Sequence, residues 1–318
     1  MKALHFDGKK LQLVEKDIPE TVNGDSLVKV LYAGICNTDL EVMNGYMDFR
    51  GTIGHEFVGV VEKTNSPGLL GKHVVGDIHV SCGECEFCAQ GLGRHCPNRT
   101  VLGIQDKDGS LAEYLTLPTR NLHIVPSDVP DIAAVFAEPL AAAYEITQQL
   151  QILNDYRVLV VGDGKLGQLV ARVLQFQTEN LLVVGKHPEK LAILEELNIP
   201  TRLLSEFDAE EKSFHVVVDA AGSWEGWQLA MKMVRPRGFL VLKSTYSGEH
   251  KCNPANLVVN EITVIGSRGG SFSDSLHLLR KNIIDPSEII SAVLPVSEWK
   301  KAFKIARLPE SLKVLIEF

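Results

Sequence analysis

The segment Arg157–Leu169, RVLVVGDGKLGQL, decides the fold of this chain. Its first half is nearly continuous in apolar residues, which is typical of a parallel strand buried on both faces. Its second half has the spacing G-x-G-x-x-G at Gly162, Gly164 and Gly167. Between a strand and a helix, the first glycine permits a tight turn, the second lets a pyrophosphate approach the backbone, and the third lets the helix pack closely. The segment therefore predicts a dinucleotide-binding unit with the phosphates at the helix N-terminus.

The region around this motif alternates between strands and helices. Lys165 and Leu166 open the predicted helix and belong to the predicted coenzyme site. The strands are apolar runs, namely RVLVVG, NLLVVG, FHVVVDAAG, GFLVLKS and EITVIGS, and helical segments such as PEKLAILEEL and WEGWQLAMKMV separate them. This alternation predicts a doubly wound parallel sheet. The chain before Pro118 consists of short β segments broken by glycine, which predicts a separate β-rich domain.

The segment VVGKHPEK, residues 183–190, follows the second predicted strand. Enzymes that use NAD usually carry Asp or Glu here for the ribose 2′-hydroxyl, whereas this chain has Gly185, Lys186 and His187. The missing carboxylate removes repulsion, and the two basic side chains can bind a 2′-phosphate through charge-assisted hydrogen bonds. The segment therefore favours NADP over NAD. The alternative is that Lys186 and His187 form only a solvated helix entrance, which leaves NAD as the other candidate.

Four cysteines between residues 82 and 96 follow the spacing C-x2-C-x2-C-x7-C. They are Cys82, Cys85, Cys88 and Cys96. Four thiolates at such spacings can surround one tetrahedral zinc ion and fix a loop that has little core of its own. The competing interpretation is an iron–sulfur cluster, but the longer last gap fits zinc better. A full quartet has no open position, so the predicted site is structural.

A second set of possible metal ligands is dispersed along the chain. Cys36 precedes the pair His55 and Glu56 in GTIGHEFVGVVE, and Glu138 begins an apolar helix. A catalytic zinc has three protein ligands and one open position, so a thiolate, an imidazole and a carboxylate form a plausible set. Adjacent residues of a strand face opposite sides, so His55 and Glu56 can share one ion only if the backbone bends, which Gly54 would permit. Taken singly, each of these residues also fits an ordinary packing role.

These motifs in this order, GICNTD, GHE, the cysteine quartet, EPLA and GDGKLG, resemble the zinc-containing medium-chain dehydrogenase/reductase family. The chain is most similar to the sorbitol and threonine dehydrogenase branch, because Glu138 stands where alcohol dehydrogenases have a third ligand cysteine. The resemblance implies an α/β fold with two domains. Residues 1–139 and 268–318 would form a GroES-like β-rich catalytic domain with the structural zinc lobe, and residues 140–267 a Rossmann domain.

The resemblance also implies roles for residues around a catalytic zinc. Cys36, His55 and either Glu56 or Glu138 would hold this ion, which makes two zinc ions per chain. Thr38 would pass the substrate proton, and Asp39 would orient the histidine ligand.

Further residues are assigned to the coenzyme and the substrate in the same way. Lys313 would lie near the coenzyme pyrophosphate, and Ser267 and Arg268 would line the nicotinamide. Candidates for the substrate pocket, from position only, are the aromatic residues Tyr46, Phe49 and Tyr246.

The expected function is reversible hydride transfer between an alcohol and NAD(P), with an aldehyde or ketone as the oxidised partner. We expect a homodimer or homotetramer, as in the family. Two alternatives remain at this point: a zinc-free NADPH-dependent reductase of quinones or enones, and a dinucleotide-binding protein without catalysis.

Composition excludes several other classes of protein. The 318 residues carry a formal net charge of −8, with basic residues scattered among acidic ones, so no cationic surface for nucleic acid is expected. The start, MKALHFDGKK, is too polar for a signal peptide, and no apolar run approaches the length of a membrane span. We therefore expect a cytoplasmic protein whose partner is a small molecule.

Overall fold

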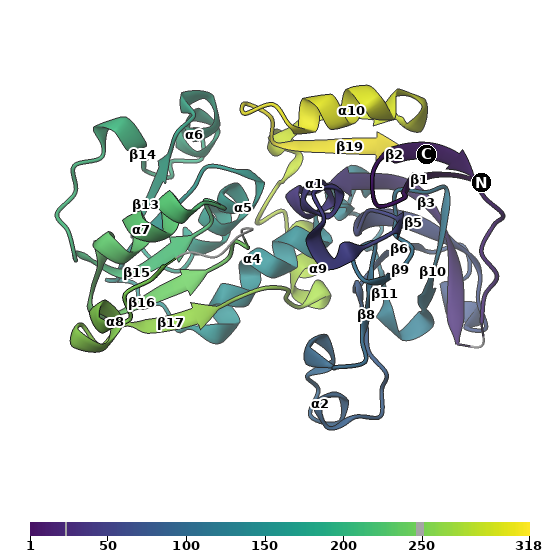
Figure 1. Ribbon diagram of the computed structural model, residues 1–318, viewed down its shortest axis with the longest axis horizontal. Coiled ribbons are helices and arrows are strands. Elements are labelled where there is room, and N and C mark those ends of the chain that lie inside the picture. Colours follow the sequence, from purple (N-terminus) through teal and green to yellow (C-terminus); the bar gives the residue numbers. More distant parts are fainter. Residues whose placement is uncertain (23, 246–250) are drawn as a thin grey trace. The chain divides into compact units, whose positions relative to one another are not determined.

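The computed structural model describes residues 1–22, 24–245 and 251–318 (Figure 1). The chain forms two compact units: Met1–Glu138 together with Phe272–Phe318, and Pro139–Ser271. The predicted domain bounds, residues 1–139 with 268–318 and residues 140–267, stay a prediction. Tyr246, one of the candidates for the substrate pocket, lies outside the described residues.

The unit Pro139–Ser271 contains a six-stranded sheet in the order β14-β13-β12-β15-β16-β17, and every pair in it is parallel. The predicted parallel sheet is thus confirmed. Sequence patterns missed only the short edge strand β14, which has three residues and little apolar character. The strands are β12 (Arg157–Val161), β13 (Asn180–Gly185), β14 (Thr201–Leu203), β15 (Phe214–Asp219), β16 (Val234–Leu242) and β17 (Thr263–Gly266).

Helices connect these strands in both directions from the centre of the sheet (Figure 1). α5 packs on β12 and β13, and α7 packs on β15 and β16. The strand order reverses between β12 and β15, and right-handed crossovers then place the two sets of helices on opposite faces. The helices are α4 (Ala137–Gln149), which starts in the other unit, α5 (Lys165–Leu174), α6 (Pro188–Glu195), α7 (Trp224–Met233) and α8 (Ala255–Val259).

The core of this sheet comes from the apolar runs. Leu159, Val217 and Leu240, from three neighbouring strands, are fully buried in one cluster. Burial of each such side chain contributes ~1.5–3 kcal/mol relative to an exposed one. The apolar runs therefore fix the sheet, and the loops after its strands remain available for polar chemistry.

The other unit is mainly antiparallel β structure. Its largest sheet has seven strands in the order β11-β6-β5-β3-β19-β18, with β10 also paired to β3. Two three-stranded sheets, β2-β1-β4 and β7-β8-β9, accompany it. The strands are β1 (Lys2–Phe6), β2 (Leu11–Glu15), β3 (Asp25–Ile35), β4 (Gly51–Thr52), β5 (Glu56–Lys63), β6 (His73–Gly76), β7 (His79–Val80), β8 (Thr100–Leu102), β9 (Asp106–Lys107), β10 (Tyr114–Pro118), β11 (Leu122–Ile124), β18 (Ile290–Pro295) and β19 (Lys313–Glu317).

Short helices lie between these strands. They are α1 (Asn37–Met43), α2 (Glu86–Ala89), α3 (Asp131–Ala134), α9 (Phe272–Arg280) and α10 (Trp299–Ala306). The central strand β3 pairs with both β5 and β19, and Gly34 lies opposite Glu56 while Ile35 lies opposite Val314. The end of β3 therefore meets the beginnings of β5 and β19. This register brings three distant parts of the chain to one place.

Candidate functional site: a cluster of possible metal ligands and a dinucleotide loop

The end of β3 carries a cluster of possible metal ligands. Ligand atoms of Cys36, His55 and Glu56 all lie within 4.8 Å of one another. Gly54 has a φ of +100°, and a Cβ there would lie 2.7 Å from the backbone nitrogen of Leu111. This left-handed bend is the one that the sequence required for His55 and Glu56 to face a common point. The structure thus brings together residues that are 20 positions apart in the chain.

Asp39 links two members of this cluster. Its Oδ1 lies 3.1 Å from His55 Nδ1, and its Oδ2 accepts a hydrogen bond from the Cys36 backbone N–H at 2.8 Å. Because a carboxylate can only accept, Nδ1 carries the proton and Nε2 is the nitrogen left for a metal. Burial lowers the pKa of His55, but the negative charges of Asp39 and Cys36 outweigh this and raise the pKa well above its usual value. Thr38 lies beside the cluster, with its Oγ1 3.8 Å from Cys36 Sγ.

Glu56 forms a buried ion pair with Lys313. The ammonium group bonds to Glu56 Oε2 and lies 5.8 Å from the centre of the Phe136 ring. Glu56 Oε1 is buried and has no hydrogen-bond partner among the described residues. A buried carboxylate oxygen without a partner fits a bound cation, and thiolate, imidazole and carboxylate form a ligand set that suits zinc.

Lys313 was predicted to lie near the coenzyme pyrophosphate. Its side chain is 2% exposed and paired with Glu56, which the sequence did not indicate. Burial lowers the pKa of Lys313, and the charges of Glu56 and Cys36 more than reverse this effect. The predicted pyrophosphate contact stays a prediction.

Glu138 does not belong to the cluster found among the described residues. It lies in the first turn of α4, and burial raises the pKa of its carboxyl group to about 7, although the positive charges of His55 and Lys313 act in the opposite direction. The geometry therefore favours Glu56 over Glu138 as the carboxylate nearest the thiol and the imidazole.

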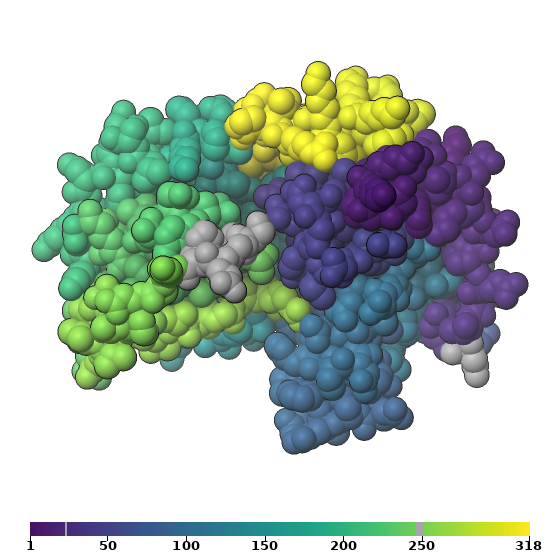
Figure 2. Space-filling model, in the orientation of Figure 1, coloured from purple at the N-terminus to yellow at the C-terminus, as the bar shows by residue number. Residues whose placement is uncertain are grey.

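The four cysteines of the quartet converge in a separate lobe around α2 (Figure 1; residues near 90, blue in Figure 2). Four of their Sγ pairs are 3.5 to 3.9 Å apart. Thiolates at ~2.3 Å from a tetrahedral zinc ion lie ~3.8 Å from one another, so the spacing fits a single ion. Backbone N–H groups of Glu84 and Cys85 lower the pKa of Cys82 to about 6, which favours a thiolate ligand.

The glycine motif has the geometry that a dinucleotide requires. Gly162 has a φ of +118°, and a Cβ there would lie 2.7 Å from the carbonyl oxygen of Ala220, at the end of the neighbouring strand. A Cβ on Gly167 would collide with the carbonyl of Gly162, whereas a Cβ on Gly164 would meet nothing within 4 Å. The open space at Gly164, where α5 begins with Lys165 and Leu166, leaves room for phosphates beside the N–H groups of the first turn.

Beyond β13, the structure joins the predicted residues to one that sequence analysis passed over. Asp163 accepts hydrogen bonds from the backbone N–H groups of Lys186 (2.6 Å) and His187 (2.8 Å). Its Oδ1 lies 3.0 Å from His187 Nδ1. The only signal in the sequence was its place between the first two glycines of the motif.

The residues predicted to line the nicotinamide follow β17. Lys243, which sequence analysis also missed, donates to Ser267 Oγ at 3.1 Å and to the carbonyl of Arg268 at 2.9 Å. A third bond goes to the carbonyl of Ala142 in α4 at 2.6 Å. Lys243 thus fixes this segment, and the contact of Ser267 and Arg268 with the nicotinamide stays a prediction.

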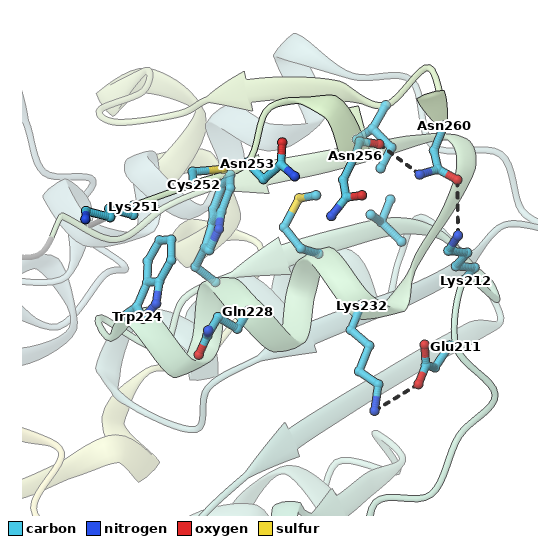
Figure 3. A pocket seen from close by; sticks show the side chains of 14 residues that line it. Glu211, Lys212, Trp224, Gln228, Lys232, Lys251, Cys252, Asn253, Asn256 and Asn260 are labelled. Atoms are coloured by element: carbon cyan, nitrogen blue, oxygen red, sulfur yellow. Dashed lines mark hydrogen bonds and ion pairs between the residues drawn. The ribbon is translucent and has the colours of Figure 1, made fainter. Parts of the chain in front are cut away.

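Two aromatic candidates for the substrate pocket differ in environment. Phe49 is 6% exposed and belongs to the hydrophobic core, so its ring serves packing. Tyr46 is 42% exposed. A cavity of about 410 Å³ in the other unit lies between α7 and α8, and none of the predicted site residues lines it (Figure 3). Among the helices that the structure describes, none combines the length and the apolar character that a membrane span needs.

Comparison with known proteins identifies a matching family for a segment of each unit. Residues 22–127 match the alcohol dehydrogenase GroES-like domain, and residues 166–282 match the zinc-binding dehydrogenase family. The starvation-sensing protein RspB of Escherichia coli is 29% identical over 97% of this chain and 96% of its own length. The sorbitol dehydrogenase of Halalkalibacterium halodurans is 27% identical over 99% of this chain and 98% of its own.

Solved structures agree with these matches. The crystal structure of RspB from Escherichia coli, described as a short chain alcohol dehydrogenase complexed with NADH, has a TM-score of 0.92 at 27% identity. It covers 100% of this chain and 99% of that one. The alcohol dehydrogenase TADH from a Thermus species has a TM-score of 0.91 at 27% identity and covers 100% of both chains.

Proposed function

Because the chain belongs to the zinc-containing medium-chain dehydrogenase/reductase family and is an NAD(P)-dependent alcohol or polyol dehydrogenase, we propose that Cys36, His55 and Glu56 hold its catalytic zinc. The predicted fold class, a GroES-like β-rich domain with a Rossmann domain, is confirmed by the two matched families. The reaction is hydride transfer between an alcohol and NAD(P). The single observation that supports our ligand assignment is the convergence of a thiol, an imidazole and a partnerless carboxylate oxygen.

The charges of the proposed ligands suit a divalent cation. One thiolate and one carboxylate balance the ion, and a second carboxylate would make it a poorer Lewis acid. Lys313 holds Oε2 of Glu56, which leaves Oε1 as the oxygen available to the metal. We therefore propose Glu56 as the resting ligand and Glu138 as a nearby carboxyl group that does not bind in the same state.

Two side chains beside the proposed ligands would take part in the reaction, one acting on the substrate proton and one on the histidine ligand. When bound, the zinc supplies Lewis-acid stabilisation of an alkoxide oxygen. Thr38, beside Cys36, is placed to relay the proton of the substrate hydroxyl: its oxygen would accept that proton while its own hydroxyl proton passes to water, and the reverse reaction would run the relay backwards. Asp39 keeps the Nδ1 proton of His55 in place, so that Nε2 would be the nitrogen that binds the metal.

The quartet Cys82, Cys85, Cys88 and Cys96 would hold the second zinc, whose role is structural because no ligand position is left open. It would fix a lobe whose helix α2 has only four residues. Within the lobe, Cys96 is the one cysteine that is fully buried.

For the coenzyme, we propose NADP as the preferred form. Support comes from the absence of a carboxylate at Gly185 and from the basic residues Lys186 and His187. The substrate would be a small polyol or related alcohol, since relatives include a sorbitol dehydrogenase and a D-arabitol-phosphate dehydrogenase. A panel of polyols, hydroxy amino acids and simple alcohols, each with NADP and NAD, identifies the class.

We also propose a cytoplasmic homodimer or homotetramer. Val258 and Val259 of α8 are 74% and 80% exposed, and Val264 lies half-exposed on the edge strand β17. An open edge strand next to exposed apolar residues favours association with a second copy. Light scattering of the purified protein tests the oligomeric state, and a monomer at micromolar concentration would contradict it.

Metal analysis of variants tests the ligand assignment. Cys36→Ser and His55→Ala should each lower the zinc content from about two to about one ion per chain and abolish turnover. Cys252→Ser, at an exposed cysteine that belongs to neither cluster, is the matched control and should keep both ions. If Cys36→Ser retains both zinc ions and wild-type turnover, the assignment fails. One zinc in the wild-type protein would instead favour a reductase or a binding protein.

A further inference from the structure

Asp163 has an unusual position for an acidic residue in a phosphate-binding loop. Its carboxylate is 8% exposed, and Oδ2 accepts from the backbone N–H groups of both Lys186 and His187. His187 Nδ1 lies 3.0 Å from Oδ1 and 3.1 Å from Oδ2. One side chain thus connects the loop after β12 to the turn after β13, its neighbour in the sheet.

The same carboxylate explains why residue 185 is a glycine. A Cβ on Gly185 would collide with Oδ2 of Asp163. Any side chain at this strand end, including the acidic residue that NAD enzymes usually carry there, is therefore incompatible with the observed position of Asp163. Gly185 thus leaves the space that the Asp163 carboxylate fills. In place of the acidic residue that NAD enzymes carry at the end of this strand, the chain has a buried carboxylate from the neighbouring loop.

Lys186 and His187, which Asp163 holds, have exposed and partly exposed side chains respectively, whereas the Asp163 carboxylate itself is buried. His187 Nδ1–H donates to the Asp163 carboxylate, so the second proton of the imidazolium form would lie on Nε2 and be available to an anion. The His187 side chain is 30% exposed, and Lys186 is exposed. The strand end therefore presents basic groups outward, with the acid beneath them and already bonded to three donors.

A further contact fixes this arrangement. The buried side chain of Gln168, in α5, donates to the carbonyl of Lys190 in α6 at 2.8 Å and to the carbonyl of Asp163 at 3.5 Å. The loop that carries Asp163 and the helix that follows His187 are thus tied on both sides. Such preorganisation lowers the cost of holding a charged ligand group.

We propose that Asp163 is a positioning residue for coenzyme choice, which orients His187 and the 186–187 backbone so that Lys186 and His187 Nε2 bind the 2′-phosphate of NADP. The inference rests on the proposed preference for NADP. A 2′-phosphate would accept charge-assisted hydrogen bonds from both side chains, whereas the 2′-hydroxyl of NAD offers no charge for them to bind. Asp163 acts through His187 and does not itself need to contact the coenzyme.

The test uses two probes that contain only the adenosine half of the coenzymes, adenosine 2′,5′-bisphosphate and 5′-AMP, in titration calorimetry of the zinc-replete protein. Asp163→Asn should weaken binding of the bisphosphate by about tenfold, as expected for loss of a charge-assisted hydrogen bond, and change binding of 5′-AMP by less than about twofold. Asp208→Asn, at an exposed aspartate of the same unit, is the matched control and should change neither affinity.

A second readout separates positioning from general loosening of the loop. In nitrogen NMR spectra, the wild-type His187 ring should show a protonated Nδ1, and this signal should change in Asp163→Asn. His187→Ala should weaken binding of the bisphosphate by a similar factor. The double variant Asp163→Asn/His187→Ala should bind the bisphosphate about as weakly as His187→Ala alone. His187→Ala also serves if the Asp163 variant does not fold.

Three outcomes would overturn the inference. Asp163→Asn could strengthen bisphosphate binding, which would mean that the carboxylate repels the phosphate and selects NAD. Asp163→Asn could weaken binding of both probes equally, which would mean that the carboxylate only stabilises the loop. His187→Ala could leave the bisphosphate affinity unchanged. Failure of both probes to bind wild-type protein would instead contradict the proposed coenzyme site itself, and none of these results depends on the catalytic zinc.

Discussion

Lys313 and Glu56, which lie 257 positions apart in the chain, form an ion pair with side chains that are 2% and 1% exposed, beside the cluster of Cys36 and His55. The pairing follows from the register in which β3 separates β5 from β19. It connects the stability of the β-rich unit to the position of a proposed metal ligand.

Removal of the ammonium group should therefore be costly. Lys313→Met leaves the Glu56 carboxylate buried without its partner, and we expect a loss of ~3–5 kcal/mol in the free energy of unfolding, measured in urea. The control is Lys301→Met, which breaks the exposed pair with Glu298 and should cost less than ~1 kcal/mol. Equal losses in the free energy of unfolding for the two substitutions would show that the buried pair contributes no more to stability than the exposed pair.

Asp39 should control the affinity of the cluster for zinc. Asp39→Asn removes the charge that fixes the Nδ1 proton of His55, and we expect zinc to bind ~10–100-fold more weakly in competition with a chelator. Asp131→Asn offers a matched control, because Asp131 also bonds to an imidazole, that of His73, but at a half-exposed site. The prediction is wrong if both variants release zinc at the same chelator concentration.

The quartet should support the lobe and leave the other cluster intact. Cys96→Ser should lower the zinc content by about one ion per chain, because the three remaining thiolates no longer close a tetrahedral site. Limited proteolysis should then cut within residues 82–96, while Cys252→Ser remains resistant. Retention of two ions by Cys96→Ser would exclude the quartet as a zinc site.

Substitutions at two glycines of the dinucleotide loop should have different effects, one on coenzyme affinity and the other on thermal stability. Gly164→Ala adds a methyl group to open space, so the melting temperature should stay near that of the wild type while the affinity for both coenzymes falls by about tenfold or more.

Gly167→Ala is the contrasting variant, because its methyl group would collide with the carbonyl of Gly162, and it should unfold at a clearly lower temperature. Thermal unfolding and fluorescence titration measure the two effects. Normal coenzyme binding by Gly164→Ala would show that phosphates do not occupy this space.

The sequence by itself determined the features whose partners are close along the chain. Apolar runs fixed the strands of the parallel sheet, the glycine spacing fixed the turn after β12, and the quartet lies within 15 consecutive residues, so its convergence needs no long-range contact. The short strand β14 was not predicted, because its three residues carry too little of a hydrophobic pattern to indicate a strand.

Only the tertiary structure decided the rest, because distant residues meet through strand register, which no local pattern records. The pairing of β3 with β5 and β19 set Glu56, and not Glu138, beside Cys36 and His55, and it gave Glu56 the ammonium of Lys313. The parallel pairing of β12 with β13 likewise brought Asp163 to His187. In each case a buried charged group meets its partner at another strand of the same sheet, where separation in space is small and separation in sequence is large.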